Sequence, residues 1–199
     1  YLNNGNGTFA LTDSLPAVAG GDIDLADCNL DGQLDVALMG VDATGAGRNL
    51  ILYNTGGGHF TAIAEFTQMA GGSVRWAEQT GDGRQEIAFM GRPLDGSRFV
   101  RGKSIAIADG SHWAVMAYDY GFEDGSVSLA EAFCDGRMQV LQTGHGVGGA
   151  DSTFINEYDQ AFGYHAYDMG AVGMLTVDHG VGMFGDMNSD GELDIFIMG

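Results

Sequence analysis

The sequence predicts an all-β fold, a β-propeller of four blades with about four antiparallel strands in each blade. Two observations lead to this prediction: one unit occurs four times along the chain, and each unit reads as short strands joined by glycine-rich turns. The chain has 199 residues, of which 45% are apolar, enough for one packed core of domain size. We therefore expect residues 1–199 to form a single domain, either a whole propeller or a segment of a larger one.

The repeat is anchored by four Asp-Gly pairs. The pairs begin at residues 31, 82, 135 and 190, so successive anchors are 51, 53 and 55 residues apart. A glycine follows each anchor at a constant interval and places repeat junctions near residues 40, 91, 144 and 199. Another glycine stands ten residues before each anchor, at Gly21, Gly72, Gly125 and Gly180. A regular period is typical of propeller blades, whereas a β-sandwich, the competing all-β arrangement, does not require one.

Each unit is expected to contain four short strands. Residues 34–39 and their counterparts after the other anchors are mostly apolar at both odd and even positions, as in a strand covered on both faces. Residues 49–53 and 60–64 flank Asn54-Thr55-Gly56-Gly57-Gly58, a sequence typical of a hairpin turn. A further strand at residues 72–78 leads into the next Asp-Gly loop.

Charge and composition exclude several classes of protein. The chain has 8 Lys and Arg against 27 Asp and Glu, a formal net charge of −19, which argues against a nucleic-acid partner because phosphate backbones are repelled. No apolar run approaches the roughly 18 residues of a membrane-spanning helix, so no membrane span is expected. The two cysteines, Cys28 and Cys134, occupy non-equivalent repeat positions, so we expect free buried thiols rather than a disulfide.

Two of the Asp-Gly loops have oxygen side chains at alternating positions. Loop 1 (residues 27–35) and loop 4 (residues 186–194) both read Asp-x-Asn-x-Asp-Gly-x-x-Asp. Ca²⁺ takes about six to eight oxygen ligands, and alternate residues of a tight loop can point inward when glycine at position six permits the bend. Position twelve is apolar and a strand follows, so these loops are not EF-hands. The alternative interpretation is that these Asp, Asn and Gly residues only form turns.

These loops, together with Asn-Gly-Asn-Gly-Thr-Phe at residues 4–9, resemble FG-GAP/VCBS repeats, and the resemblance covers the whole chain. It implies that each repeat is a propeller blade whose loop binds Ca²⁺. It also implies a secreted or cell-surface adhesion or binding module, as in integrin α-subunits and many bacterial exoproteins. The implied side-chain ligands are Asp27, Asn29, Asp31, Asp35, Asp186, Asn188, Asp190 and Asp194. We expect Gln33 and Glu192, at position seven, to add backbone carbonyl oxygens.

The two middle loops depart from this pattern. Loop 2 (residues 78–86) keeps oxygen-bearing side chains at the ligand positions, but some of them differ in length from those of loops 1 and 4. A weaker metal site is therefore expected at Glu78, Thr80, Asp82 and Glu86. Loop 3 (residues 131–139) has Phe133 at the central ligand position. Both loops have an arginine at position seven, Arg84 and Arg137. Our hypothesis is that a guanidinium group partly replaces Ca²⁺ there by neutralising the remaining carboxylates.

No catalytic motif emerges, and we expect no enzymatic activity. The five histidines form no close metal-binding pair, and neither a Gly-x-Ser-x-Gly elbow nor a Walker loop is present. The expected function is an extracellular, calcium-stabilised structural or adhesive module whose partner is an extracellular protein, a glycan or another copy of itself. The alternatives are a lectin-like carbohydrate-binding propeller and the noncatalytic propeller of a polysaccharide-active enzyme. In an extracellular setting Asn6-Gly7-Thr8 is a sequon, which makes Asn6 a glycosylation candidate.

The two ends of the chain match complementary parts of one repeat. Tyr1 aligns with Leu52, near the end of one strand, whereas Gly199 completes another. Strands from both ends are therefore expected either to share a blade that closes a four-blade ring, or to pair with neighbouring subunits or domains. A head-to-tail arrangement that does not close would give a filament.

Overall fold

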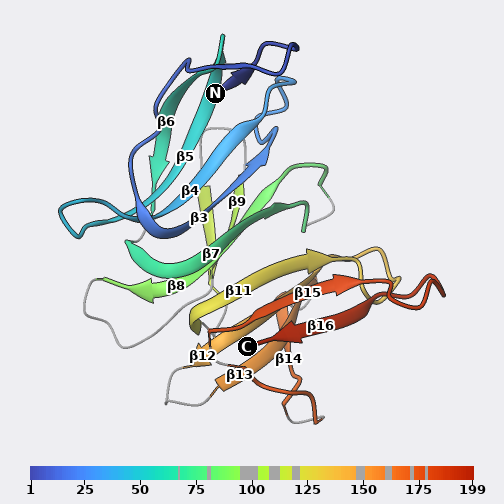
Figure 1. Cartoon of the computed structure of the whole chain (residues 1–199). Coiled ribbons are helices and arrows are strands. Elements are labelled where there is room, and N and C mark those ends of the chain that lie inside the picture. The colour runs from blue at the N-terminus through green and yellow to red at the C-terminus, as the bar shows by residue number, and fades with distance from the viewer. Residues whose placement is uncertain are drawn as a thin grey trace.

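The computed structural model describes residues 1–66, 68–79, 82–94, 103–107, 113–117, 122–146, 151–159, 163–170, 173–177 and 179–199. These residues contain sixteen strands and no helix (Figure 1). Every strand pair among them is antiparallel. The prediction of an all-β protein built from antiparallel sheets is therefore confirmed. Within the same residues, no helix has the length and apolar character that crossing a membrane would require.

Three four-stranded sheets follow one another along the chain, and in each of them strands adjacent in sequence are adjacent in the sheet. Sheet 1 consists of β3 (Ala19–Ala26), β4 (Asp35–Val41), β5 (Gly47–Gly56) and β6 (His59–Glu65). Sheet 2 consists of β7 (Met69–Ala77), β8 (Glu86–Pro93), β9 (Lys103–Ile107) and β10 (Trp113–Ala117). Sheet 3 consists of β11 (Phe122–Ala130), β12 (Gln139–Gly146), β13 (Asp151–Asp159) and β14 (Gly163–Asp168). Two further pairs have two strands each: sheet 4, β15 (Val181–Gly185) with β16 (Asp194–Met198), and the hairpin of β1 (Leu2–Asn3) and β2 (Phe9–Ala10).

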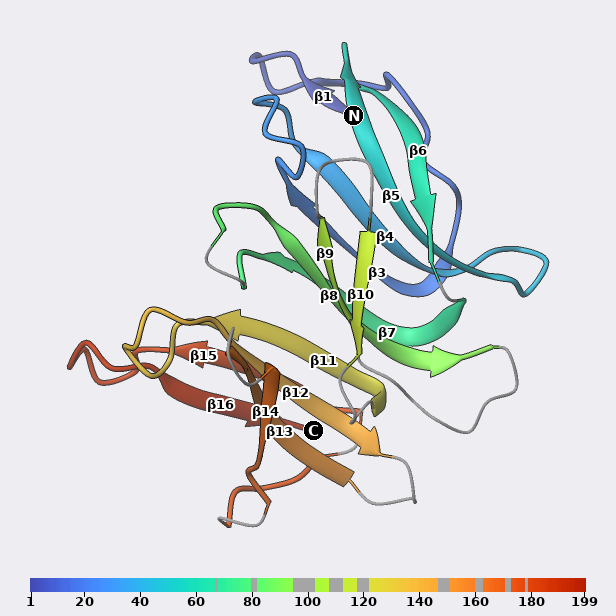
Figure 2. The same cartoon turned by 180° about the vertical axis from the view of Figure 1, so that it is seen from behind.

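The first strands of the four sheets lie side by side in a row. β7 packs against β3 on one side and β11 on the other, and β15 packs against β11. Figures 1 and 2 show sheet 2 between sheet 1 and the pair formed by sheets 3 and 4. In the described part of the chain, β15 and β3 are not among the strands that pack together. The sheets thus succeed one another in chain order, and the row stays open between its ends.

The glycine ten residues before each anchor allows two strands to approach closely. At Gly21, Gly72 and Gly125, a Cβ atom would lie 1.9, 1.7 and 1.7 Å from a carbonyl oxygen of the second strand. The pairing register shifts at each of these places, so each first strand contains a bulge. Any larger residue would force the first two strands of the sheet apart.

The limits of the sheets differ from the repeat junctions read from the sequence. The glycines at residues 40, 91 and 144 lie inside the second strands β4, β8 and β12. The strand that leads into each Asp-Gly loop belongs to the same sheet as the strand after the loop, and it is the first strand of that sheet. The turn between β5 and β6 is also tighter than expected, because it consists of Gly57 and Gly58, both with positive φ.

Apolar residues fill the space between successive sheets. Second strands are apolar at successive positions because alternate side chains face the preceding and the following sheet. Between sheets 1 and 2 the core contains Ala37, Met39, Ile51, Met69, Val74, Trp76, Ile87 and Phe89. Between sheets 2 and 3 it contains Ala88, Met90, Val127, Val140 and Phe154.

Candidate metal-binding loops

Each Asp-Gly loop joins the first strand of a sheet to the second. Loops 1 to 4 connect β3 to β4, β7 to β8, β11 to β12 and β15 to β16. The anchor glycine has a φ between 80° and 92° in all four loops, at Gly32, Gly83, Gly136 and Gly191. Position four also has a positive φ in loops 1, 3 and 4, at Leu30, Cys134 and Ser189. The sequence repeat is therefore a repeat of one backbone conformation that needs glycine at position six.

In loop 1 the side-chain oxygens at positions one, three and five surround the backbone amides of the turn. Asp27 accepts hydrogen bonds from the Asp31 N–H (2.9 Å) and the Gly32 N–H (2.8 Å). Asn29 Oδ1 accepts from the same Asp31 N–H (3.0 Å), and Asp31 Oδ1 accepts from the Gln33 N–H (2.8 Å). Because Asp27 and Asn29 share one donor, their oxygens converge at the turn.

Loop 4 repeats these contacts. Asp186 accepts from the Asp190 N–H (3.2 Å) and the Gly191 N–H (3.0 Å), and Asn188 Oδ1 accepts from the Asp190 N–H (2.9 Å). Asp190 Oδ1 accepts from the Glu192 N–H (2.9 Å). Hydrogen bonds from the Glu192 N–H and the Asn188 side chain lower the pKa of Asp190, which keeps this carboxylate ionised at neutral pH.

The carboxylate at position nine lies beneath the loop and fastens it to the sheet. Asp35 is fully buried. Its Oδ2 accepts from the backbone N–H (3.1 Å) and the thiol (3.0 Å) of Cys28, and its Oδ1 accepts from the Asn54 N–H on β5 (2.9 Å). In loop 4, Asp194 Oδ2 accepts from the Met187 N–H (2.9 Å). Asp35 thus ties its loop to the third strand as well as to the second.

Loops 2 and 3 keep this fastening with longer side chains. Glu86 Oε2 accepts from the Gln79 N–H (2.5 Å), and Gln139 Oε1 accepts from the N–H groups of Ala132 (2.6 Å) and Phe133 (3.2 Å). Position nine therefore has a structural role in every loop, whichever polar residue occupies it. A carboxylate oxygen has a second lone pair, so this role leaves Asp35, Glu86 and Asp194 able to bind a cation as well.

Loop 2 brings three carboxylates together. Oxygens of Glu78, Asp82 and Glu86 all lie within 4.8 Å of one another, and this is the one such group of acidic, histidine and cysteine side chains in the described residues. Thr80, the fourth expected ligand, lies outside the described residues. Loop 2, which is the weaker candidate by sequence, therefore has a donor set that suits a divalent cation.

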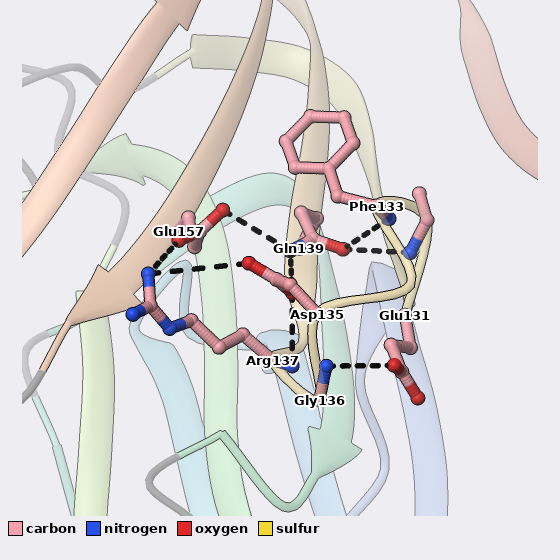
Figure 3. A network of polar contacts seen from close by, with 8 residues as sticks. Glu131, Phe133, Asp135, Gly136, Arg137, Gln139 and Glu157 are labelled. Carbon is pink, nitrogen blue, oxygen red and sulfur yellow. Dashed lines mark hydrogen bonds and ion pairs between the residues drawn. The ribbon is translucent and has the colours of Figure 1, made fainter.

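Loop 3 holds an arginine beside its carboxylates (Figure 3). Arg137 Nη1 lies 2.6 Å from Glu157 Oε1 on β13 and 3.9 Å from Asp135 Oδ2. Gln139 Nε2 donates to Glu157 Oε2 (3.2 Å) and lies 3.4 Å from Asp135 Oδ1. With Phe133 at position three and a guanidinium group beside its carboxylates, loop 3 does not fit a cation. In loop 2 three carboxylates lie close enough to share a cation, whereas those of loops 1 and 4 form no such group among the described residues, so a cation in loops 1 and 4 stays a prediction.

The two cysteines are free, as expected, but only Cys28 is buried. Burial and the hydrogen bond to Asp35 raise the pKa of the Cys28 thiol, so it stays protonated. Cys134, at position four of loop 3, is exposed and has a positive φ. Its Sγ lies 3.5 Å from Glu192 Oε2 of loop 4.

Asp22 and Asp24, which the sequence analysis did not single out, join β3 to β7. Asp22 Oδ2 accepts from Ser73 Oγ (2.9 Å) and the Val74 N–H (3.2 Å) and pairs with Arg75. Asp24 Oδ2 accepts from the Trp76 N–H (2.8 Å). The alternation of aspartate with Ile23 and Leu25 was the available signal, because it is the pattern of a strand with one polar face.

The glycosylation candidate Asn6 lies exposed in the turn between β1 and β2. Its Oδ1 accepts hydrogen bonds from the Thr8 N–H (3.1 Å) and the Thr8 hydroxyl (2.6 Å). The sequon is therefore accessible, and its modification stays a prediction.

Comparison with protein-family models gives no match to this chain, and comparison with curated proteins gives none either. Membership of the FG-GAP/VCBS family thus stays a prediction that rests on the repeat and the loop residues.

Proposed function

We propose that this chain is an extracellular, calcium-stabilised structural module in which the sheets are blades of an FG-GAP/VCBS-like β-propeller. Ca²⁺ binds at the loops between the first and second strands. The observation that carries the proposal is the recurrence of one loop conformation at the same place in four successive sheets, with Asp and Asn oxygens converging in loops 1 and 4. The oxygens at positions one, three and five that accept the turn amides are also of the kind that Ca²⁺ prefers as ligands.

The arrangement of the sheets supports the propeller part of the proposal. In a propeller each blade is a four-stranded antiparallel sheet, and the blades surround a central axis. Sheets 1, 2 and 3 are meanders of that kind, and their first strands form one continuous row with β15. An antiparallel sandwich packs one pair of sheets face to face, whereas here sheet 2 has an apolar core on each side.

The role of the metal is structural. Bound Ca²⁺ would hold loop 1 through Asp27, Asn29, Asp31 and Asp35, and loop 4 through the corresponding residues, and would neutralise carboxylates that repel one another. The chain carries a net charge of −19, so such neutralisation removes a large unfavourable term from the folded state. Exposed loops with few protein ligands suit dissociation constants of about 10⁻⁴–10⁻³ M, as in extracellular calcium modules.

Calorimetric titration of position-five variants tests the proposal. Asp31→Asn, Asp82→Asn and Asp190→Asn each remove one charged ligand, from loops 1, 2 and 4, and each is expected to eliminate one Ca²⁺ site. Asp135→Asn is the matched control in loop 3, where Arg137 already neutralises the carboxylate, and it should leave the titration unchanged. Absence of Ca²⁺ binding to the unaltered chain, or an equal effect of all four variants, would contradict the proposal.

A further inference from the structure

Two Asn-Gly steps, Asn4-Gly5 and Asn6-Gly7, lie in the turn between β1 and β2. The side-chain carbonyl carbon of an asparagine lies close to the backbone nitrogen of the next residue, and a following glycine has no side chain to hinder their approach. When that nitrogen attacks the carbonyl carbon, a succinimide ring forms. The surroundings of the two steps differ in the structure, and the difference affects both the carbonyl group and the attacking nitrogen.

The side-chain carbonyl of Asn6 is polarised by two donors. Asn6 Oδ1 accepts hydrogen bonds from the Thr8 N–H (3.1 Å) and the Thr8 hydroxyl (2.6 Å). Asn4 Nδ2 donates to Thr8 Oγ1 (2.9 Å), which leaves the hydroxyl hydrogen directed at Asn6. Two donors on one carbonyl oxygen stabilise the negative charge that develops there when a nucleophile adds to the carbon.

The nitrogen that would attack is held at Asn4-Gly5 but not at Asn6-Gly7. The Gly5 N–H donates to Asn3 Oδ1 (2.9 Å), which fixes the orientation of that peptide unit. Within residues 1–66, the Gly7 N–H donates to no protein acceptor. The Gly7 peptide unit is therefore freer to turn its nitrogen toward the side-chain carbon of Asn6.

The Asp-Gly anchors, which allow the same ring closure, are protected by their loops. In loops 1, 3 and 4 the anchor glycine N–H donates to the carboxylate at position one, over distances of 2.8–3.0 Å. An ionised carboxylate is also a poorer electrophile than an amide, because its negative charge repels a nucleophile. Asn6-Gly7 thus combines an activated carbonyl with an unheld nitrogen.

We propose that Asn6-Gly7 is a site of spontaneous succinimide formation and deamidation. The Gly7 nitrogen forms a bond to Asn6 Cγ, and the Cγ–Nδ2 bond breaks. The proton of the Gly7 N–H leaves with Nδ2, which departs as ammonia. A water molecule then opens the ring at one of its two carbonyl carbons, which leaves either aspartate or isoaspartate at this position. The reaction requires only water, so it does not rest on calcium binding or on the proposed function.

The reaction competes with glycosylation of the same side chain. A glycan on the Asn6-Gly7-Thr8 sequon would be attached through Asn6 Nδ2, the atom that is lost as ammonia. Deamidation therefore closes the sequon, and each event adds a negative charge to a chain whose net charge is already −19. Glycosylation and ring closure are alternative fates of Asn6.

Peptide mapping by mass spectrometry, with an assay for isoaspartate, tests the site on glycan-free chain kept at mildly alkaline pH. In the folded chain Asn6 is expected to deamidate about 10-fold faster than Asn4. Thr8→Val removes the hydroxyl donor and should slow the reaction at Asn6 about 5-fold, whereas Thr8→Ser keeps the hydroxyl and the rate. Asn3→Ala releases the Gly5 N–H and should speed the reaction at Asn4 about 3-fold, with Asn6 unchanged.

The same chain unfolded in urea is the control for sequence effects. Without the turn, Asn4 and Asn6 should react at similar rates, and Thr8→Val should have little effect. Equal rates at the two asparagines in the folded chain would overturn the proposal. It would also be overturned if Asn6 reacted only after unfolding, or if Thr8→Val and Thr8→Ser gave the same rate in the folded chain.

Discussion

Asp22 shows how one side chain joins two sheets. Burial raises the pKa of Asp22, but the Arg75 guanidinium and hydrogen bonds from Val74, Ile23 and Ser73 outweigh burial and lower it. The carboxylate therefore stabilises the folded state only while it is ionised. This stabilisation is complete above the ordinary aspartate pKa of 3.8 and is lost as the pH falls through the lower pKa of the folded state.

The expected consequence is a pH-dependent effect of Asp22→Asn. At neutral pH the variant should lose about 1 kcal/mol of unfolding free energy, because a neutral amide is a weaker acceptor and does not pair with Arg75. Its stability should also fall less steeply than that of the unaltered chain as the pH drops below the ordinary pKa. Urea denaturation at a series of pH values measures both effects. If the unfolding free energies of the two proteins fell in parallel with pH, Asp22 would not titrate in the way described.

At this scale the sequence indicated the glycine positions and the loop oxygens but not the direction of the side chain at position nine. The anchor glycines are visible because positive φ restricts the choice of residue to a few types. Asp35 points beneath its loop, where two donors of Cys28 and the Asn54 N–H, nineteen residues further along the chain, bind its carboxylate. Nothing in the local pattern indicates that this carboxylate also accepts hydrogen bonds beneath the loop.

The elements illustrate why loops of one conformation differ in their chemistry. In loop 3 the Arg137 guanidinium lies between Asp135 and Glu157, and the Glu157 side chain is only 6% exposed. Loop 3 is thereby connected to β13, the third strand of its sheet. In sheet 1 the hydrogen bond from the Asn54 N–H on β5 to Asp35 connects loop 1 to the third strand. The same connection between elements is thus made by an ion pair in one sheet and by a hydrogen bond in another.

Removal of this arginine should destabilise sheet 3. Arg137→Met is expected to lower the free energy of unfolding by about 1–3 kcal/mol, because it leaves the Glu157 carboxylate buried without its cation, and partial exposure of Arg137 keeps the loss below that of a fully buried pair. Arg84→Met is the matched control at position seven of loop 2. Arg84 has no ion pair within the described part of the chain, so its loss should cost less than about 0.5 kcal/mol. Equal effects of the two substitutions in urea denaturation would argue against a specific role for Arg137.

The strands themselves were largely predictable, whereas the grouping of strands into sheets was not. Residues 34–39 and 60–64 were expected to be strands because of their apolar pattern, and β4 and β6 occupy those places. The spacing between repeats is the same whichever strand is taken as the first of a repeat, so the spacing does not show which four strands form one sheet. Only the pairing of β3 with β4, through the loop between them, fixes the start of each sheet.

In the whole molecule, the four-fold repeat predicted a succession of similar sheets but not how the row ends. The packing between sheets depends on residues about fifty positions apart, which the repeat makes recognisable. Whether the last face meets the first depends on the rotation from each sheet to the next, and no residue pattern specifies that angle. The exposed faces of sheets 1 and 4 therefore emerge only from the structure.

Thermal unfolding with and without calcium tests the central claim most directly, that Ca²⁺ bound in the Asp-Gly loops stabilises the molecule. Saturating Ca²⁺ is expected to raise the melting temperature by about 5 °C relative to excess chelator, because the ion binds the folded chain preferentially. The combined Asp31→Asn, Asp82→Asn and Asp190→Asn variant should not respond. NaCl of matched ionic strength controls for the screening of the net charge of −19. An unchanged melting temperature in chelator, or an equal rise in NaCl alone, would contradict the claim.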